Sequence, residues 1–279
     1  MSVPGTVAVV GGGTMGAGIA HVFLAAGSRV VLAEADADRA AAGADAVAAS
    51  LRKAQERGKI ASADAALTGL TTVDSLAALP ADTALAVEAV PEDLALKKTV
   101  LTAVASACPD AVLASNTSSL SITALAEGLP GERVVGMHFF NPVPVQALVE
   151  LVHHAGLSPE VLARVRGWAE ALGKTVIEVR DSPGFATSRL GVFVGLEAIR
   201  MLEEGVASAE DIDTGMRLGY AWPMGPLRLT DLVGLDVRLS IAEHLARELG
   251  PRFEPPALLR EKVARGELGR KSGQGFFTW

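Results

Sequence analysis

The sequence predicts a Rossmann-type α/β domain, with a doubly wound parallel sheet, followed by a smaller all-α domain. Three observations carry this prediction. Short β-branched or apolar runs alternate with helical patterns up to about residue 182. A glycine-rich turn follows the first of these runs. Beyond Ser182-Pro183-Gly184 the periodicity is helical, with no convincing strand.

Each element of the first domain is indicated by its own pattern. The runs predicted as strands are 6–10, 29–33, 84–88, 111–114, 134–137 and 175–179. The patterns predicted as helices are 14–27, 37–57, 92–107, 121–128 and 158–172. Strands that alternate with helices indicate a parallel sheet covered on both faces. We therefore expect residues 1–182 to form the Rossmann-type domain and 183–279 the helical one, in which Ser208 begins a helix with a capping box.

Composition excludes several classes of protein. The 279 residues carry a formal net charge of −7, which argues against nucleic acid as a partner. The chain has one cysteine, Cys108, so no internal disulfide forms, and we expect a buried thiol in a cytoplasmic protein. No apolar run is long enough to span a membrane, and the N-terminus lacks the features of a signal peptide. We predict no metal ligands.

The glycine-rich turn predicts a dinucleotide site. Residues 11–16 (GGGTMG) match the G-x-G-x-x-G pattern between a strand and a helix, and the predicted contacts with the cofactor are Gly11, Gly13, Thr14, Met15 and Gly16. Glu34 ends the second strand, where a carboxylate accepts hydrogen bonds from the adenosine ribose and repels a 2′-phosphate. The next residue is alanine, not an arginine that could bind that phosphate. The cofactor predicted is therefore NAD, not NADP.

A histidine and a carboxylate in segment 134–152 are candidates for catalysis. His138 ends an apolar strand, where open α/β sheets place ligand-binding groups. Glu150 stands in an otherwise apolar run. Each alone is more often structural, whereas together in a dinucleotide-binding chain they suggest a base and its orienting carboxylate. Spacing alone leaves both interpretations open.

Over essentially its whole length the sequence resembles the monofunctional L-3-hydroxyacyl-CoA dehydrogenases, including the bacterial 3-hydroxybutyryl-CoA dehydrogenases. The segments that carry the resemblance are VAVVGGGTMGAGIA (7–20), EAVPEDLALKK (88–98), SNTSSL (115–120), GMHFFNPVPVQALVELV (136–152), DSPGFATSRL (181–190), GYAWPMGPLRLTDLVGLD (219–236) and GRKSGQGFFTW (269–279). The resemblance implies NAD-dependent oxidation of a 3-hydroxyacyl-CoA thioester, with a short acyl chain.

The resemblance also implies roles for individual residues. It makes His138 the catalytic base and Glu150 the residue that orients it. Further positions implied to contact NAD are Glu92, Lys97 and Lys271, and those lining the nicotinamide and the substrate oxygen are Ser118 and Asn141. Ser50 and Arg57 match positions that meet the CoA moiety, although the family often has lysine at the latter and a solvated helix face is the alternative.

Ser188 is the clearest departure from the family, which usually has asparagine there, beside the catalytic histidine. Ser188 either acts on the substrate directly or through a water, or marks a site reshaped for another acyl group.

Two other functions stay open: a dehydrogenase acting on an acyl-carrier-protein thioester or a free hydroxy acid, and a non-catalytic NAD-binding protein. The helical domain offers several apolar faces in fewer than a hundred residues, too few to bury them all. We therefore expect a homodimer formed mainly through residues 183–279, which also contribute to the substrate cleft.

Overall fold

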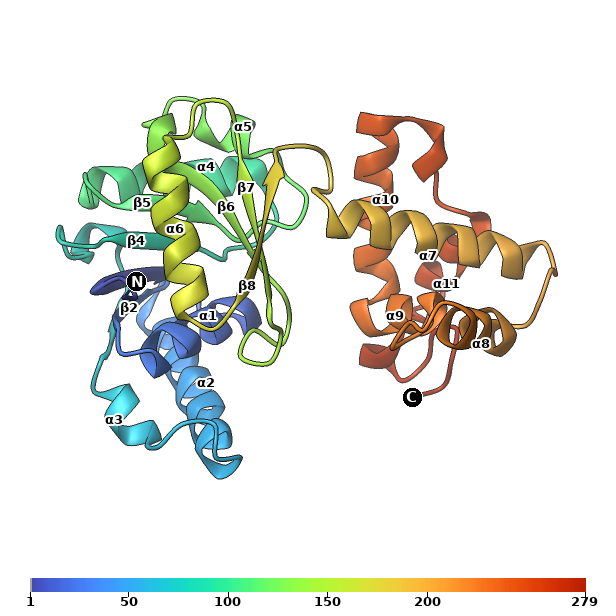
Figure 1. Cartoon of the computed structure of the whole chain (residues 1–279), viewed down its shortest axis with the longest axis horizontal. Coiled ribbons are helices and arrows are strands. Elements are labelled where there is room, and N and C mark those ends of the chain that lie inside the picture. The colour runs from blue at the N-terminus through green and yellow to red at the C-terminus, as the bar shows by residue number, and fades with distance from the viewer. Residues whose placement is uncertain (1) are drawn as a thin grey trace. The chain divides into compact units, whose positions relative to one another are not determined.

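The computed structural model describes residues 2–279 and divides into two compact units, one ending at Asp181 and the other spanning Ser182–Trp279 (Figure 1). The first unit is an α/β layered domain, and the second is built from helices. The predicted fold class is confirmed.

The first unit is organised around one sheet, whose eight strands in the described chain have the order β3-β2-β1-β4-β5-β6-β7-β8. Their bounds are β1 (Thr6–Val10), β2 (Arg29–Ala33), β3 (Leu70–Val73), β4 (Leu85–Glu88), β5 (Val112–Ser115), β6 (Val134–Phe139), β7 (Leu148–His153) and β8 (Thr175–Arg180). Every residue of β1, β4, β5 and β6 is buried. This explains why these strands are continuous apolar runs instead of alternating ones.

The sequence analysis missed two strands and one strand direction. β3 is a short edge strand whose residues are all half-buried or exposed, so it has no buried run to signal it. β7 pairs antiparallel with β6, whereas the pairings β1–β2, β1–β4, β2–β3, β4–β5, β5–β6 and β7–β8 are parallel. The sheet is therefore mixed at one pair. An antiparallel partner needs only a short connection, which the proline-containing segment after β6 provides.

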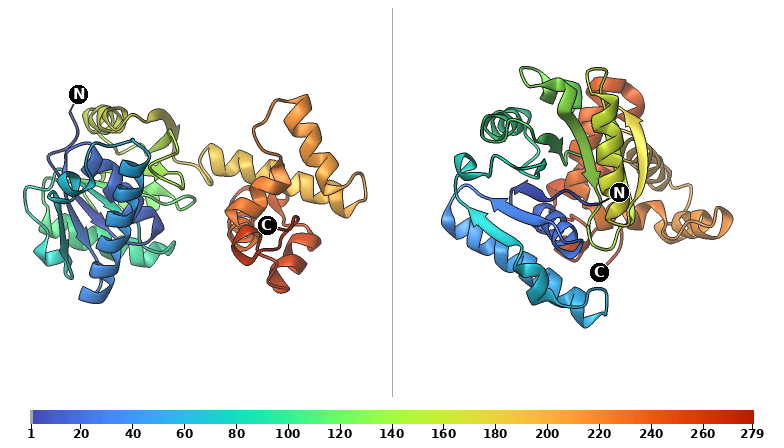
Figure 2. Two further views of the ribbon diagram at one scale, coloured as in Figure 1. Left: turned by 90° about the horizontal axis from the view of Figure 1, so that it is seen from below. Right: turned by 60° about the vertical axis from the view of Figure 1, so that its left-hand side comes forward.

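Helices cover both faces of this sheet, as predicted. Their bounds are α1 (Thr14–Ala25), α2 (Ala37–Glu56), α3 (Ala63–Leu67), α4 (Leu94–Ala107), α5 (Ile122–Ala126) and α6 (Pro159–Ala171). One core cluster joins apolar residues of α1, α2 and α6 to the strands, and α4 and α5 lie on the other face (Figures 1 and 2). Side chains cap several of these helices; Asp36, for example, accepts a 2.8 Å hydrogen bond from Arg39 N at the start of α2.

The second unit contains α7 (Thr187–Glu203), α8 (Ala209–Gly219), α9 (Pro226–Val233), α10 (Leu235–Leu249) and α11 (Ala257–Ala264). As predicted, Ser208 caps α8: its Oγ accepts from Asp211 N at 3.1 Å and donates to the Asp211 carboxylate at 2.8 Å. The buried carboxylate of Asp231 fixes the end of the chain by accepting hydrogen bonds from Phe276 N, Phe277 N and Trp279 Nε1.

Candidate active site

The turn after β1 has the backbone geometry that a bound pyrophosphate requires. Gly11 has φ +97°, and a Cβ on Gly16 would clash with the carbonyl oxygen of Gly11. A Cβ on Gly13 would meet nothing within 4 Å, so the turn is open on that side. Gly13 also provides no side-chain cap for α1. The first N–H groups of the helix are thus suited to an anionic ligand.

Glu34 lies directly beside this turn. Its Oε1 accepts a hydrogen bond from Gly12 N at 2.5 Å, and its Oε2 accepts one from Ala35 N at 3.2 Å. The carboxylate is half-buried at the carboxyl end of β2. It therefore holds the glycine turn and presents a negative charge there, which is the arrangement that favours NAD over NADP.

The structure brings His138 and Glu150 together. They are register partners in the antiparallel pair β6–β7, and His138 Nδ1 lies 2.7 Å from Glu150 Oε2. Glu150 is fully buried and His138 is 6% exposed. The Phe140 ring packs against the imidazole, with centroids 4.4 Å apart. A buried carboxylate bonded to Nδ1 fixes the tautomer and the orientation of the imidazole.

The carboxyl end of the sheet gathers the candidate residues. The pairings Val10–Glu88, Glu88–Ser115 and Ser115–Gly136 run across β1, β4, β5 and β6 to within two residues of His138. Asn116, just beyond β5, accepts a 2.9 Å hydrogen bond from Phe139 N and so holds the end of β6. The order of strands reverses between β1 and β4, which is where open α/β sheets bind their ligands.

Glu92 organises the loop that contains Ser118. Its Oε1 accepts hydrogen bonds from Thr117 Oγ1 at 2.6 Å, Ser118 N at 3.0 Å and Ser119 Oγ at 3.1 Å. Burial alone would raise the pKa of this carboxyl group, but the hydrogen bond from Thr117 and the charge of Lys97 outweigh it and hold the pKa below its usual value. Ser118 Oγ lies 3.3 Å from Glu92 Oε1. Glu92 thus stays ionised and positions Ser118.

Lys97 is buried among carboxylates at the carboxyl end of β4. It is 1% exposed, and its Nζ donates to both oxygens of Glu88, at 3.1 and 2.9 Å, and to Val90 O at 3.1 Å. Its Nζ also lies 3.4 Å from Glu92 Oε2. Burial raises the pKa of Glu88, and Lys97 partly offsets that rise. The role of Lys97 toward NAD stays a prediction.

Ser50 and Arg57 line one cleft of about 790 Å³ in the first unit. Lys53, Lys59 and Lys174 line it as well, so four cationic side chains surround it. Ser50 Oγ lies 2.8 Å from Nδ1 of the buried His21. Burial, together with the charge of a nearby lysine, lowers the pKa of this histidine.

Lys174 links this cleft to the His138–Glu150 pair. Its ammonium group is buried and donates to Val143 O at 2.6 Å and Gln146 O at 2.7 Å, both in the connection between β6 and β7. This connection also packs on α1, where a Cβ on Gly18 would lie 2.9 Å from Val143 Cβ. Lys174 also lines the cleft that contains Ser50 and Arg57.

The remaining predicted residues are not drawn into a common site within one unit. Ser188 lies half-buried in the first turn of α7, in the second unit. Lys271, also in the second unit, pairs with Asp236 at 2.6 Å. Asn141 is exposed just after β6, before Pro142. Their roles toward NAD and substrate stay predictions.

Sequence reasoning missed four residues of this region: Glu88, Asn116, His21 and Lys174. The first two lie within segments already singled out, at or just after the end of a strand, so an available signal was not used. His21 and Lys174 gave none, because their neighbours are brought to them only by folding. Among residues 2–279, no cluster of side chains suited to a metal ion is present, and no helix is long and apolar enough to cross a membrane.

These features define the class of the protein: an oxidoreductase with a dinucleotide-binding domain and a helical C-terminal domain. Residues 6–182 match the family model described as 3-hydroxyacyl-CoA dehydrogenase, NAD binding domain, and residues 184–279 match 3-hydroxyacyl-CoA dehydrogenase, C-terminal domain. The chain belongs to the 3-hydroxyacyl-CoA dehydrogenase family, and its cofactor is NAD.

Similar proteins cover the chain almost completely. The 3-hydroxybutyryl-CoA dehydrogenase of Mycobacterium tuberculosis is 44% identical over 98% of both chains, and the mitochondrial hydroxyacyl-coenzyme A dehydrogenase of Sus scrofa is 39% identical over 98% of this chain and 90% of its own. The crystal structure of (S)-3-hydroxybutyryl-CoA dehydrogenase from Ralstonia eutropha, 40% identical, superposes with a TM-score of 0.93 over 99% of both chains.

Proposed function

We propose that this protein oxidises short-chain (S)-3-hydroxyacyl-CoA to 3-ketoacyl-CoA with NAD, and catalyses the reverse reduction. The observation that carries the proposal is the buried His138–Glu150 pair at the carboxyl end of a dinucleotide-binding sheet. The names of its relatives, among them 3-hydroxybutyryl-CoA dehydrogenases, support the substrate class.

His138 acts as the general base. Neutral Nε2 takes the proton of the substrate's 3-hydroxyl group, and the imidazole becomes positively charged. Glu150, bonded to Nδ1 at 2.7 Å, stabilises that charge and holds the ring in position. In the reverse direction the imidazolium returns the proton to the ketone oxygen. Bound cofactor would supply the hydride chemistry at C3: NAD as the acceptor in the oxidation and NADH as the donor in the reduction.

The glycine turn and Glu34 would hold the pyrophosphate and the adenosine ribose of NAD. Ser118, held by Glu92, is positioned to bind the substrate oxygen and the nicotinamide, together with Asn141. These side chains orient the reactants, so that proton removal and hydride loss occur from one bound geometry.

The cleft beside α2 is suited to the CoA moiety. Arg57, Lys53 and Lys59 supply positive charge for its phosphates, in a chain whose overall net charge is negative. Ser50 supplies a hydroxyl group whose orientation is fixed by His21. These contacts favour a CoA thioester over an acyl-carrier-protein thioester or a free hydroxy acid.

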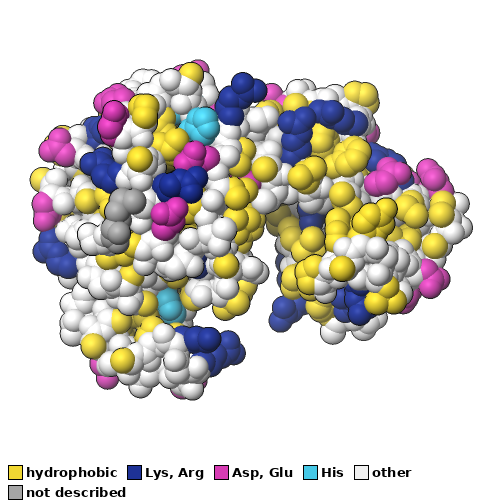
Figure 3. All heavy atoms as spheres, in the orientation of Figure 1, with side chains coloured by type: hydrophobic (Ala, Val, Ile, Leu, Met, Phe, Trp, Pro, Cys, Tyr) yellow, Lys and Arg dark blue, Asp and Glu magenta, His cyan; other side chains and the backbone are white. Residues whose placement is uncertain are grey.

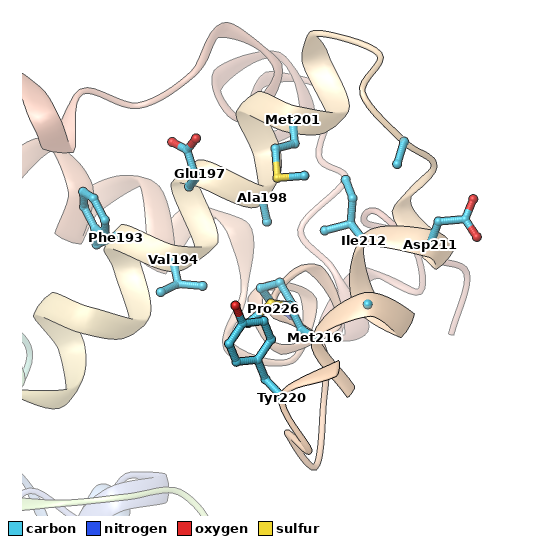
Figure 4. A pocket seen from close by; sticks show the side chains of 12 residues that line it. Phe193, Val194, Glu197, Ala198, Met201, Asp211, Ile212, Met216, Tyr220 and Pro226 are labelled. Carbon is cyan, nitrogen blue, oxygen red and sulfur yellow. The ribbon is translucent and has the colours of Figure 1, made fainter. Parts of the chain in front are cut away.

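We also propose a cytoplasmic homodimer formed through the helical unit, without a nucleic-acid partner. Large apolar side chains are exposed there, including Leu218 at 77% and Tyr220 at 73% (Figure 3). An apolar pocket between α7 and α8 is lined by Phe193, Met201 and Met216 among others (Figure 4). A second copy that covers these side chains would bury them. Sedimentation as a monomer at micromolar concentration would contradict the dimer.

The experiment that tests the function compares acetoacetyl-CoA, acetoacetyl-pantetheine and free acetoacetate as substrates with NADH. We expect the highest kcat/KM for the CoA thioester. His138→Gln should lower kcat by about 10²- to 10⁴-fold while NADH binding is retained. NADH binding without turnover of any of these compounds would instead support a non-catalytic NAD-binding protein.

A further inference from the structure

A buried histidine lines the cleft that contains Ser50 and Arg57. His21, on α1, is 4% exposed, and its Nδ1 lies 2.8 Å from Ser50 Oγ. Among residues 2–279 its Nε2 has no hydrogen-bond partner, and this atom is not fully enclosed by protein. Because the side chain lines the cleft, Nε2 is accessible to a ligand bound there. Each ring nitrogen of a histidine donates or accepts a hydrogen bond, so one of the two is left for such a ligand.

The charged side chains that line this cleft with His21 are all positive. None of the described lining residues is acidic, and the four cations are Lys53 on α2, Arg57 and Lys59 directly after it, and Lys174 before β8. None of these four forms an ion pair with a carboxylate of residues 2–279. Cations left unpaired around one cleft favour an anionic ligand, and phosphate is the anion that a CoA moiety supplies.

No carboxylate offsets these charges from the elements around His21. α1 has no other charged residue, and the connection 140–147, which packs on it, has none. The remaining charged residues of the helices and strands that pack on α1 are exposed and lie outside the cleft: Arg29 on β2, Asp64 on α3, and Asp38, Arg39, Asp45, Arg52 and Glu56 on α2. The electrostatic environment of His21 is therefore positive until an anion binds.

Without a ligand, His21 is neutral at neutral pH. Its burial, and then the positive charge of Lys174, lower the pKa of the imidazole. A phosphate monoester bound in the cleft carries about two negative charges at pH 7 and would accept a hydrogen bond from Nε2. Both effects favour the protonated imidazole, so they oppose the causes that lower its pKa. Binding of phosphate and uptake of a proton from solvent are therefore coupled, and each strengthens the other by the same factor.

Protonation of His21 also changes what Ser50 offers to a ligand. In the neutral form one donor faces the ligand: either Nε2–H, with the Ser50 hydroxyl donating to Nδ1, or the hydroxyl itself, with Nε2 unprotonated. In the charged form Nδ1 donates to Ser50 Oγ, so the hydroxyl and Nε2 both donate to the ligand. The charged pair thus offers a phosphate group two donors and a positive charge.

We propose that His21 binds a phosphate group of the CoA moiety through Nε2 and takes up a proton on binding, so that the affinity for CoA thioesters rises as the pH falls. This inference rests on the proposed function, in which the cleft accepts the CoA moiety. The direction follows from linkage, because a ligand that favours the protonated form of a group binds more tightly at lower pH. His21 contacts no reacting atom in this arrangement, so it acts on affinity and not on the chemical step.

The first test counts protons directly. Calorimetric titration of the enzyme with CoA, in two buffers of different ionisation enthalpy, gives the number of protons taken up. At pH 7 the second ionisation of a phosphate monoester, whose pKa is about 6, is nearly complete, so CoA itself contributes little. We expect uptake of roughly half a proton per CoA, and close to none for His21→Gln. Absence of uptake by the unaltered protein would overturn the proposal, even if His21→Gln failed to fold.

The second test separates binding from chemistry, by measuring kcat and KM for acetoacetyl-CoA and acetoacetyl-pantetheine with NADH between pH 6 and pH 8. For acetoacetyl-CoA, the ratio of KM in His21→Gln to KM in the unaltered enzyme should be near one at pH 8 and about tenfold at pH 6, with kcat changed less than about threefold. Forming this ratio cancels the titration of the phosphate and of His138. The pantetheine thioester has no phosphate group, so its ratio should not vary with pH.

His153→Gln is the matched control, because His153 is a half-buried histidine on β7 that does not line the cleft. Its KM ratio should stay near one throughout the pH range. Ser50→Ala removes one of the two donors and should weaken CoA binding at pH 6 by about five- to tenfold. No loss in Ser50→Ala would overturn the paired action of His21 and Ser50.

The outcomes distinguish this inference from the proposed function. A KM ratio for His21→Gln that does not vary with pH, or that varies equally for both thioesters, would show that His21 is structural. Either result would overturn the inference, while turnover of acetoacetyl-CoA upholds the dehydrogenase. If the unaltered enzyme reduced neither thioester, the proposed function would fail and the inference with it.

Discussion

Lys174→Met tests whether the connection between β6 and β7 holds the catalytic pair in position. The substitution keeps the length of the side chain but removes the ammonium group, which donates to Val143 O at 2.6 Å and Gln146 O at 2.7 Å. Both ends of this connection lead directly to the strands that carry His138 and Glu150. Releasing it should therefore affect stability and turnover together.

The magnitude follows from the two hydrogen bonds. A hydrogen bond from a charged donor contributes about 1.5–3 kcal/mol, and the carbonyl oxygens would lose their donor. Burial of the ammonium, which lowers the pKa of Lys174, offsets part of this. We estimate a net loss of about 2–4 kcal/mol, equivalent to a fall in Tm of roughly 5–10 °C. Displacing His138 by even a fraction of an ångström should lower kcat by about tenfold.

The assay combines thermal unfolding with steady-state kinetics on acetoacetyl-CoA and on its pantetheine thioester. Lys174→Met should lower kcat equally for both, because it acts on the catalytic pair, and leave the Kd of NADH within about twofold. Lys98→Met is the matched control, since Lys98 is a surface lysine that pairs with Glu127. An unchanged Tm and kcat would refute the reasoning. A loss confined to the CoA thioester would show instead that Lys174 acts on the CoA moiety.

Four further predictions address individual residues. Glu150→Gln should lower kcat by about 10²-fold or more, with the Kd of NADH unchanged, and near-normal turnover would mean that the pair is structural. Glu34→Ala should lower the ratio of kcat/KM for NADH to kcat/KM for NADPH, because the charge that repels a 2′-phosphate is lost. An unchanged ratio would mean that this carboxylate does not set the cofactor preference. Ser188→Ala should lower kcat/KM on acetoacetyl-CoA by about tenfold, and Ser188→Asn should retain activity. If Ser188→Asn abolished turnover, this position would not be equivalent to the asparagine of the family. Burial and the charge of Lys174 lower the pKa of His21 below 6.5, so the unfolded chain takes up the proton first and the free energy of unfolding falls as pH drops below 6.5. In urea unfolding at several pH values, His21→Gln should lose less stability below pH 6.5 than the unaltered protein, and an identical pH dependence would contradict this.

The sequence was most informative where function depends on local structure. The glycine turn requires a strand before it and a helix after it, and both signals are contiguous with the motif. Glu34 ends the next strand, so its place at the same edge follows from the parallel connection. His138 ends an apolar run and belongs to that edge for the same reason.

The partners of these residues depended on contacts between distant segments. Glu150 faces His138 only because β7 runs antiparallel to β6 in one register, and a shift by one residue would direct its side chain to the other face. Lys97 was predicted to contact NAD, but folding buries it against Glu88. The sequence around a lysine in a helix does not predict such burial, because the groups that surround its side chain come from other strands and loops.

The sequence by itself determined the class of fold and the position of the glycine turn that would hold the cofactor. It also identified His138, Glu150 and Glu34 as the candidate side chains for catalysis and cofactor binding. Tertiary structure decided which charges are paired: Lys174 with two carbonyl groups and Lys97 with two carboxylates. The physical reason is that strand and turn patterns reflect local backbone preferences. Burial and pairing of a charge, in contrast, depend on groups far apart in the chain that only the packed structure brings within hydrogen-bond distance.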